Sequence, residues 1–323
     1  MAPPVTPDDV RAARARISGR IRTTPLERSD AFGPTIAVKA EHLQVTRSFK
    51  IRGALNKLST FDDRQRRDGV IAASTGNHGI AVATAGGMLA VPVSVVVARS
   101  VDPTIVRRLE RLGAAVDVID SDDALDAEHA ARRRAGERGV AFVSPYNDPA
   151  VIAGQGTVAI ELLSQLEEVG WSGVDSVVVA VGGGGLISGI ATWLRHAAPD
   201  VEIVGASPAN DAAMADAVAA GGSAPAAARP TLSHSTAGGI EEGAVTVPLC
   251  RDLVDRWVRV DEHDIAAAVR TMIEGEHQLV EGAAGVALAA AADAARAGGR
   301  VVAISCGARI TPAELASVLA TEG

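Results

Sequence analysis

The stretch SVVVAVGGGGLISGI, residues 176–190, predicts the fold class of this chain. Its first six residues form an apolar run, which is typical of a strand buried on both faces of a parallel sheet. Four glycines follow, and a helical pattern begins at residue 186. Glycine amides before a helix N-terminus suit an anion, because no side chain intervenes and the helix dipole favours negative charge. The stretch therefore predicts a strand, a phosphate-binding turn and a helix, with a merely flexible turn as the alternative. It matches neither the P-loop nor the GxGxxG pattern.

The same alternation of strand and helix runs along the rest of the chain. Further β-rich runs predict strands at 36–40, 69–73, 93–98, 115–119, 202–206 and 300–305. Helical patterns lie at 6–17, 77–90, 103–112, 123–137, 150–168, 186–197, 210–220, 262–279, 284–297 and 312–321. This order predicts an α/β protein with mostly parallel sheets covered on both faces. Small residues and prolines at 221–238 predict a loop.

The composition excludes several classes of protein. The chain has 323 residues, enough for about two domains, and its 47% hydrophobic and 22% charged residues exclude a disordered or fibrous protein. The net charge is −8 and no basic stripe is interleaved with aromatics, so nucleic acid is not an expected partner. No segment has the apolar core of a signal peptide or the length to cross a bilayer. Two cysteines, Cys250 and Cys306, form neither a disulfide framework nor a zinc motif. We expect a cytoplasmic protein that binds neither nucleic acid nor membrane.

Lysine is scarce in this chain, because only Lys39, Lys50 and Lys57 occur among 31 Lys and Arg residues. Arginine stays protonated, whereas lysine can lose its proton and become a nucleophile. Lys50 lies between Phe49 and Ile51 in SFKIRGA, near the start of a helix. Apolar neighbours and a helix N-terminus both favour the neutral amine. Lys50 is therefore the candidate nucleophile, with a surface lysine as the alternative, and we expect the other two lysines to be structural or solvated.

Three other segments carry candidate ligand-binding groups. Residues 74–79, STGNHG, follow a predicted strand and open a helix, so their hydroxyls and amides suit a carboxylate; an ordinary helix cap is the alternative. Cys306 follows a predicted strand, where its thiol could bond a ligand ring or simply be buried, whereas Cys250 is expected to be core. Glu281 lies among small residues in VEGAAG, where a ligand could approach, with a solvated carboxylate as the alternative.

Together these segments resemble the serine/threonine dehydratase and serine racemase group of pyridoxal-phosphate enzymes, which has the tryptophan-synthase-β fold (fold type II). The matching motifs are TPL at 24–26, EHLQVTRSFKIRGA at 41–54, ASTGNHGIA at 73–81, VIAGQGTVAIEL at 151–162, VGGGGLISG at 181–189 and VEGAAGVALAA at 280–290. The chain looks closest to dehydratases associated with hydroxyectoine breakdown. The resemblance implies a homodimer whose cofactor lies between a large domain (1–62 and 147–323) and a small mobile domain (63–146).

The resemblance also implies a role for each matching residue. Lys50 would form a Schiff base with pyridoxal 5'-phosphate and remove the Cα proton, and Thr75 would be a second catalytic group on the opposite face. The other cofactor-binding residues would be Phe49, Asn77, Gly182, Gly183, Gly184, Gly185, Leu186, Gly239, Glu281 and Cys306. The substrate would be bound by Ser74, Thr75, Gly76, Asn77, His78 and Gln155. Within these sets the four glycines and Leu186 would hold the phosphate, while Cys306 would face the ring nitrogen.

The implied reaction is a β-elimination, in which a hydroxy amino acid such as L-threonine or L-serine yields a 2-oxo acid and ammonia. Within the same fold, an amino-acid racemase or β-replacement enzyme is an alternative. A hydroxyectoine-derived or 3-hydroxyaspartate-like compound is an alternative substrate. A binding protein that keeps the cofactor pocket and a nicotinamide-dependent oxidoreductase are alternatives from other classes.

The sequence departs from the family pattern at several positions. Arg47 stands where the family usually has glycine and adds positive charge at the mouth of the expected site. Ala308 and Arg309 replace the usual Gly-Asn, which changes the surroundings of the cofactor ring. Ser207 and Ala213 occupy positions where the racemases carry acidic metal ligands, so we predict no metal site.

Overall fold

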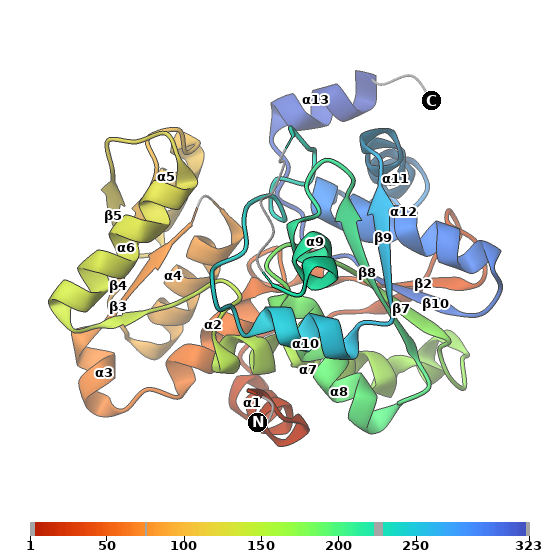
Figure 1. Ribbon diagram of the computed structural model, residues 1–323, viewed down its shortest axis with the longest axis horizontal. Coiled ribbons are helices and arrows are strands. Elements are labelled where there is room, and N and C mark those ends of the chain that lie inside the picture. Colours follow the sequence, from red (N-terminus) through yellow and green to blue (C-terminus); the bar gives the residue numbers. More distant parts are fainter. Residues whose placement is uncertain (1–3, 75, 223–228, 321–323) are drawn as a thin grey trace.

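The computed structural model describes residues 4–74, 76–222 and 229–320, and within these residues it contains two β-sheets (Figure 1). The larger sheet has the order β1 (Leu26–Arg28), β2 (Ile36–Lys39), β10 (Val301–Ile304), β7 (Ser176–Ala180), β8 (Glu202–Pro208), β9 (Arg256–Val260). The smaller sheet has the order β5 (Ala115–Val118), β4 (Val93–Val97), β3 (Val70–Ala73), β6 (Ala141–Phe142). All neighbouring strands are parallel except β1, which is antiparallel to β2. The predicted α/β class with mostly parallel sheets is confirmed.

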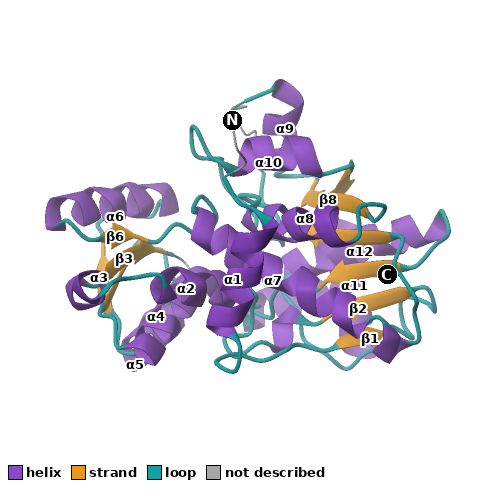
Figure 2. Ribbon diagram, turned by 90° about the horizontal axis from the view of Figure 1, so that it is seen from below, coloured by secondary structure: helices purple, strands orange, loops and turns teal. Residues whose placement is uncertain are grey.

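Helices surround both sheets. They are α1 (Pro7–Ile17), α2 (Lys50–Ser59), α3 (Asp63–Asp68), α4 (Asn77–Leu89), α5 (Pro103–Arg111), α6 (Ala124–Arg138), α7 (Pro149–Gln165), α8 (Gly185–Ala197), α9 (Ala213–Ala220), α10 (Thr246–Leu253), α11 (Glu262–Glu274), α12 (Gly282–Arg296) and α13 (Pro312–Ala320), with 3-10 helices η1 (Glu41–Leu43) and η2 (Glu167–Val169). Helix α12 packs along the larger sheet and α6 along the smaller one. Helix α2 contacts both α4 and α7, and it lies with α1 and α7 between the two sheets (Figure 2).

The central strands of the larger sheet are covered on both faces. Every residue of β2, β7 and β10 is buried. Because successive side chains of a strand point to opposite faces, this burial requires helices on each side of the sheet. The apolar run at 176–181 therefore has the environment that its sequence predicts. None of the helices within the described residues has the combination of length and apolarity that a membrane span requires.

All the predicted strands are present, each ending within two residues of its expected bounds. The strands β1, β6 and β9 and the helices α3 and α10 are additions that the sequence patterns did not predict. Helix α9 begins at Ala213 rather than at residue 210, and α11 ends at Glu274 rather than at 279. His277, three residues beyond the end of α11, has a φ of 53°, so the helix does not continue through it. Residues 229–238 form the predicted loop, while 223–228 lie outside the described residues.

A buried ion network anchors α2 to the larger sheet. The Arg52 guanidinium donates hydrogen bonds of 2.7 to 2.9 Å to the carboxylates of Glu41 and Glu161. Lys39 Nζ donates to Glu161 at 3.1 Å and to the carbonyl of Thr24 at 2.6 Å. Burial opposes the charge of Arg52, but the two carboxylates outweigh that effect and raise its pKa. Helix α2 is thus fixed through charges that have no access to water.

The expectation that Lys39 and Lys57 are structural or solvated is confirmed. Lys39 is fully buried within the ion network. Lys57 lies on α2, and its Nζ is 2.6 Å from a carboxylate oxygen of Asp148. Its side chain is 23% exposed. Neither lysine lines the cavities described below, so Lys50 is distinct from both.

Candidate active site

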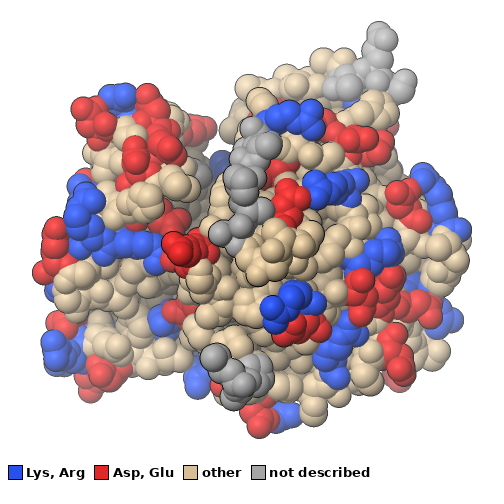
Figure 3. Space-filling view, viewed as in Figure 1, with Lys and Arg blue, Asp and Glu red and all other residues tan. Residues whose placement is uncertain are grey.

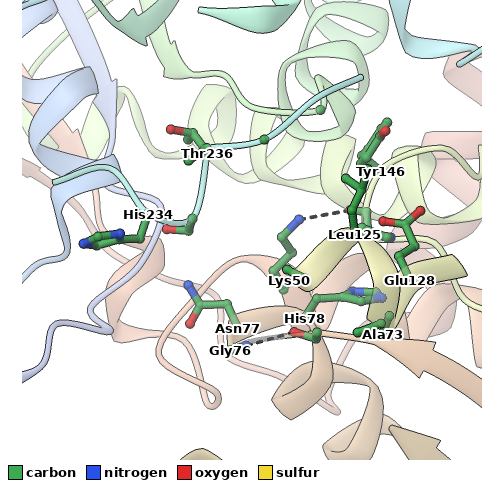
Figure 4. Close-up of a pocket in the computed structure, with 18 of the residues that line it drawn as sticks. Lys50, Ala73, Gly76, Asn77, His78, Leu125, Glu128, Tyr146, His234 and Thr236 are labelled. Atoms are coloured by element: carbon green, nitrogen blue, oxygen red, sulfur yellow. Dashed lines mark hydrogen bonds between the residues drawn. The ribbon is translucent and has the colours of Figure 1, made fainter. Parts of the chain in front are cut away.

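Two adjoining cavities lie at the carboxyl ends of β3, β7 and β10, which is where parallel sheets bind ligands. A notch separates the two sheet-containing parts in the space-filling view (Figure 3). The outer cavity has a volume of about 240 Å³ and the inner one about 40 Å³. Both are lined by Lys50, Asn77, Tyr146, Gly183, Ser235 and Thr236. Because these residues are shared, one ligand can extend from the inner cavity into the outer one. Figure 4 shows residues that line the outer cavity.

Nearly all of the predicted site residues line one of these cavities. The outer cavity also contains Ser74, Gly76, His78 and Gly239. The inner cavity also contains Phe49, Gly182, Gly184, Gly185, Leu186, Glu281 and Cys306. Thr75 lies outside the described residues. The structure thus brings together segments that are more than 250 residues apart in the chain.

Gln155 is the exception, and its predicted substrate-binding role is corrected. Its side chain is buried between α7 and α2, where Oε1 accepts a hydrogen bond of 3.1 Å from the backbone N–H of Gly53. A Cβ at Gly53 would lie 2.4 Å from Nε2 of Gln155, so the amide packs directly on α2. Gln155 lines neither cavity. It supports the helix that carries Lys50.

Lys50 occupies the first turn of α2 and faces both cavities. Its Nζ donates a hydrogen bond of 3.0 Å to the carbonyl of Pro145 and lies 5.0 Å from the centre of the Phe49 ring (Figure 4). Burial lowers the pKa of Lys50 to about 8, although the nearby Glu281 favours the ammonium form. The alternative of an ordinary surface lysine is wrong. A substantial fraction of this amine is neutral near physiological pH, as a nucleophile requires.

The lowered pKa predicts how Lys50 reacts with an acylating reagent. Only the neutral amine is acylated, so labelling of Lys50 by acetic anhydride should rise with pH to a midpoint near 8. A lysine in a model peptide should instead show a midpoint near 10.4, about the unperturbed value. Mass spectrometry of the cofactor-free protein measures the labelled fraction at each pH. A midpoint for Lys50 that coincides with that of the peptide would contradict the lowered pKa.

Residues 182–185, the four glycines after β7, form a backbone turn that we call the glycine cradle. Side chains at these positions would clash with their neighbours. A Cβ at Gly183 would lie 2.3 Å from the Tyr146 ring, and one at Gly182 would lie 2.8 Å from the backbone of Thr236. Gly184 has a φ of 81°, which other residues rarely adopt. The first intrahelical bond of α8 is donated by Ser188, so the amides before it have no acceptor within the helix. This set of free donors at a helix N-terminus fits a phosphate group.

Filling the cradle should weaken cofactor binding. The Gly183→Ala variant must displace either the Tyr146 ring or the loop, because its Cβ would lie 2.3 Å from that ring. We expect the dissociation constant for pyridoxal phosphate to rise by about fivefold to a hundredfold, as overpacking of this kind costs about 1–3 kcal/mol. Gly173→Ala is the matched control, since a Cβ there has no neighbour within 4 Å. Equal affinities in both variants, measured by calorimetry, would show that the run is only a flexible turn.

Glu281 connects the segments around the inner cavity. Its buried carboxylate accepts hydrogen bonds from Asn77 Nδ2 at 2.8 and 3.1 Å, from the Ser235 hydroxyl and from the backbone N–H of Arg309 at 2.9 Å. A Cβ at Gly307 would lie 2.8 Å from this carboxylate. The alternative of a solvated carboxylate is therefore wrong. Because Asn77 donates to Glu281, its carbonyl oxygen is left to accept a hydrogen bond from a ligand.

The two cysteines have different environments. Cys306 follows β10 and lines the inner cavity, and burial together with Glu281 holds the pKa of its thiol well above the usual value. The thiol therefore stays protonated and is a weak hydrogen-bond donor. Cys250 is core, as predicted: its sulfur lies behind Gly184, and burial raises the pKa of its thiol to about 12. Both cysteines are unpaired.

The start of α4 forms the wall of the outer cavity. The backbone N–H of Gly76 donates to the Ser74 hydroxyl at 3.0 Å. His78 Nε2 lies 2.8 Å from the carbonyl oxygen of Val143. Burial, with a further effect from Lys50, lowers the pKa of His78 to about 3. His78 is thus neutral, and its Nε2 is occupied by the backbone rather than free for a substrate.

Sequence reasoning missed several residues that line both cavities. Tyr146 packs its ring over the glycine cradle, and its hydroxyl accepts a hydrogen bond of 2.9 Å from the backbone N–H of Glu241. Ser235 and Thr236 come from the loop that was predicted only as a small-residue connection. One sequence feature could have drawn attention to Tyr146: it is the only tyrosine in the chain.

The predicted absence of a metal site concerns Ser207 and Ala213. The Ser207 hydroxyl donates to the carbonyl of Val181 at 3.1 Å, and Ala213 starts α9. Among the described residues, no group of three or more His, Cys, Asp or Glu side chains could hold a metal ion. Metal independence remains a prediction.

Comparisons with known proteins agree with this geometry. Residues 17–307 match a family model described as "Pyridoxal-phosphate dependent enzyme". An L-threonine ammonia-lyase of Thermotoga maritima is 35% identical over 304 residues, which cover 93% of this chain and 74% of that protein. An L-threonine ammonia-lyase of Geobacter sulfurreducens is 38% identical over 285 residues, which cover 87% and 69%. Maize serine racemase has a solved structure that is 30% identical, with a TM-score of 0.88, and the match covers 98% of this chain and 97% of that chain. Since the family match spans most of its length, this chain belongs to the pyridoxal-phosphate dependent enzymes, and pyridoxal phosphate is its cofactor.

Proposed function

We propose that this protein is a pyridoxal-phosphate dependent ammonia-lyase that converts a β-hydroxy amino acid, such as L-threonine or L-serine, to a 2-oxo acid and ammonia. The observation that carries the proposal is the position of Lys50, whose amine has a pKa of about 8 and faces both the glycine cradle and the outer cavity. The two L-threonine ammonia-lyases that match most of the chain support the same reaction.

The residues of the inner cavity fit the cofactor. When bound, pyridoxal phosphate withdraws electrons from the Cα atom of an attached amino acid and makes its proton acidic. The amides at 182–186 would hold the phosphate, the Asn77 carbonyl oxygen would accept from the ring hydroxyl, and the protonated Cys306 thiol would face the ring nitrogen. A neutral thiol does not stabilise a positive charge on that nitrogen as a carboxylate would. This favours loss of the β-hydroxyl over a long-lived negative charge on the cofactor ring.

The chain's own groups account for the proton transfers and for substrate orientation. The N-terminus of α4 would receive the substrate carboxylate, because its first amides have no acceptor within the helix. The neutral amine of Lys50 would take the Cα proton. The Cα–H bond breaks as Lys50 takes that proton, and the Cβ–O bond breaks as the hydroxyl takes up one proton. The two proton transfers balance, so the net loss is one water. The enamine that is released takes up one water and yields the 2-oxo acid and ammonia, so the net reaction consumes no other reagent.

We also propose that residues 63–146, which contain β3 to β6, form a small domain that moves over the cavities, and that the protein acts as a cytoplasmic homodimer. The small-domain proposal is supported by the sheet topology, since the four strands of the smaller sheet all fall within this range. A racemase of the same fold is the second candidate. It is favoured by the match to maize serine racemase.

The test measures all products from one reaction. Protein supplied with pyridoxal phosphate and L-threonine or L-serine should release ammonia and 2-oxo acid in equal amounts, and a chelator should not change the rate. Chiral chromatography of the remaining amino acid measures inversion at Cα. Inversion that equals or exceeds ammonia release would favour the racemase. Protein that binds the cofactor but releases no ammonia from any β-hydroxy amino acid would refute the lyase.

A further inference from the structure

Arg309 places an unpaired positive charge in the wall of the outer cavity. Its backbone N–H is fixed by Glu281, and its side chain lies against the turn before α4. A Cβ at Gly76 would lie 2.3 Å from Nε and 2.6 Å from Cζ of Arg309. The Nε atom is buried without a hydrogen-bond partner. In the part of the chain that the structure describes, no carboxylate lies within ion-pair distance of this guanidinium.

The other charges around the outer cavity do not neutralise Arg309. Glu128 lines the cavity, but its carboxylate lies 2.7 Å from the guanidinium of Arg132. His234 lines it too and lies 3.0 Å from Glu314. Lys50 lines the same cavity, but Glu281 lies near its amine. Among the described residues that line the outer cavity, Arg309 is therefore the cation that no adjacent carboxylate offsets.

Further arginines lie in the part of the chain that contacts the Arg309 loop. Burial lowers the pKa of Arg108 on α5, and Arg111 and Arg47 lower it further, so these three side chains share one region. The region adjoins Arg309, because the backbone N–H of Ala308 donates to the carbonyl of Arg47 at 2.9 Å. The backbone N–H of Thr104, which donates to Asp102 at 2.7 Å and so caps α5, lowers the pKa of Asp102, and Arg309 lowers it further without forming an ion pair with it. A field of this sign attracts anionic ligands.

A neutral hydroxy amino acid would leave this charge without a partner. It has one carboxylate, which the amides at the start of α4 would bind in the proposed function. When such a ligand fills the cavity, the Arg309 guanidinium would lose its hydration without gaining an ion pair. An unpaired buried charge is strongly unfavourable. A planar guanidinium binds a carboxylate through two parallel hydrogen bonds. A second carboxylate on the substrate would supply the missing partner.

We propose that Arg309 is a specificity-determining residue that selects a β-hydroxy amino acid whose side chain ends in a carboxylate, the class of 3-hydroxyaspartate. The inference rests on the proposed ammonia-lyase reaction for its chemistry, but not for the binding contact itself. Loss of ammonia from 3-hydroxyaspartate gives a four-carbon 2-oxo dicarboxylic acid, and atoms balance as for L-threonine.

A binding experiment tests the contact without any turnover. Malate and lactate differ in one carboxylate and contain no amine, so neither can react. We expect the protein loaded with its cofactor to bind malate at least about tenfold more tightly than lactate. Arg309→Gln should lose about ten- to a hundredfold in malate affinity while lactate affinity changes less than about threefold, and Arg309→Lys should keep part of the preference. Arg64→Gln, on the exposed face of α3, is the matched control. Equal binding of malate and lactate by the wild-type protein overturns the proposal even if no variant folds.

A kinetic experiment tests whether Arg309 determines which substrate the protein prefers. Ammonia release should give a higher kcat/KM for one L-3-hydroxyaspartate diastereomer than for L-threonine, and Arg309→Gln should remove that preference. Turnover of L-threonine with no preference for 3-hydroxyaspartate, or an equal loss on both substrates in Arg309→Gln, overturns the role of Arg309 and leaves the lyase intact. Tight malate binding that depends on Arg309, with no ammonia from any substrate, supports the contact and refutes the lyase.

Discussion

The Lys50→Ala variant should release ammonia from its best substrate about a hundredfold to ten-thousandfold more slowly than the wild-type protein. The change removes the amine that faces both cavities and whose pKa of about 8 makes it a base near physiological pH. No other lysine lines either cavity, so none can replace it. Coupled assay of the 2-oxo acid measures the rate.

Lys57→Ala is the matched control for this variant. Lys57 lies on the same helix but pairs with Asp148 outside the cavities, so its loss should leave the rate within a few-fold. After borohydride reduction and unfolding, the wild-type protein should retain the cofactor on the peptide that contains Lys50, and the Lys50→Ala variant should retain none. Unchanged production of 2-oxo acid by Lys50→Ala would show that another group removes the proton.

The Arg52→Met variant should lose about 3–5 kcal/mol of unfolding free energy, which is the usual result of breaking a buried ion pair from one side. Arg52 is fully buried and is hydrogen-bonded to both Glu41 and Glu161. Methionine fills a similar volume but leaves the two carboxylates with only Lys39 as a nearby buried cation. The free energy follows from urea unfolding monitored by circular dichroism.

The control for this variant is an exposed ion pair. Arg64 lies 3.3 Å from Asp68 on α3, with 82% of its side chain exposed. Its replacement by methionine should cost less than about 1 kcal/mol. If both variants lose the same small amount, the buried network does not stabilise the fold, and the position of α2 is set by apolar packing alone.

The sequence predicts the parts of the fold whose pattern is local. The apolar runs of β7 and β10 indicate doubly covered strands because burial on both faces leaves no polar position. The strand β1 has only three residues, and β9, with the sequence RWVRV, is half-exposed at the sheet edge. Such strands are fixed by partners far away in the chain, and no local pattern marks them.

The same distinction holds for the site. Lys50 and the glycine run are recognisable because each requires a particular residue type beside a strand or helix end. Other side chains complete the lining of the cavities, such as Ser235 and Tyr146. They come from loops whose paths depend on the whole fold. Gln155 shows the converse error: it belongs to a matching motif, yet its side chain supports α2 instead of lining a cavity.

The buried network around Arg52 also has a mechanical consequence. It ties α2 to η1, β2 and α7, which all belong to the part of the molecule that carries the glycine cradle. Lys50 begins that same helix. Any displacement of the proposed small domain, residues 63–146, would therefore leave helix α2 and the glycine cradle in constant register. Asn77, Pro145 and Tyr146 would move with that domain, so its displacement would change the groups around the Lys50 amine without moving the helix that carries it.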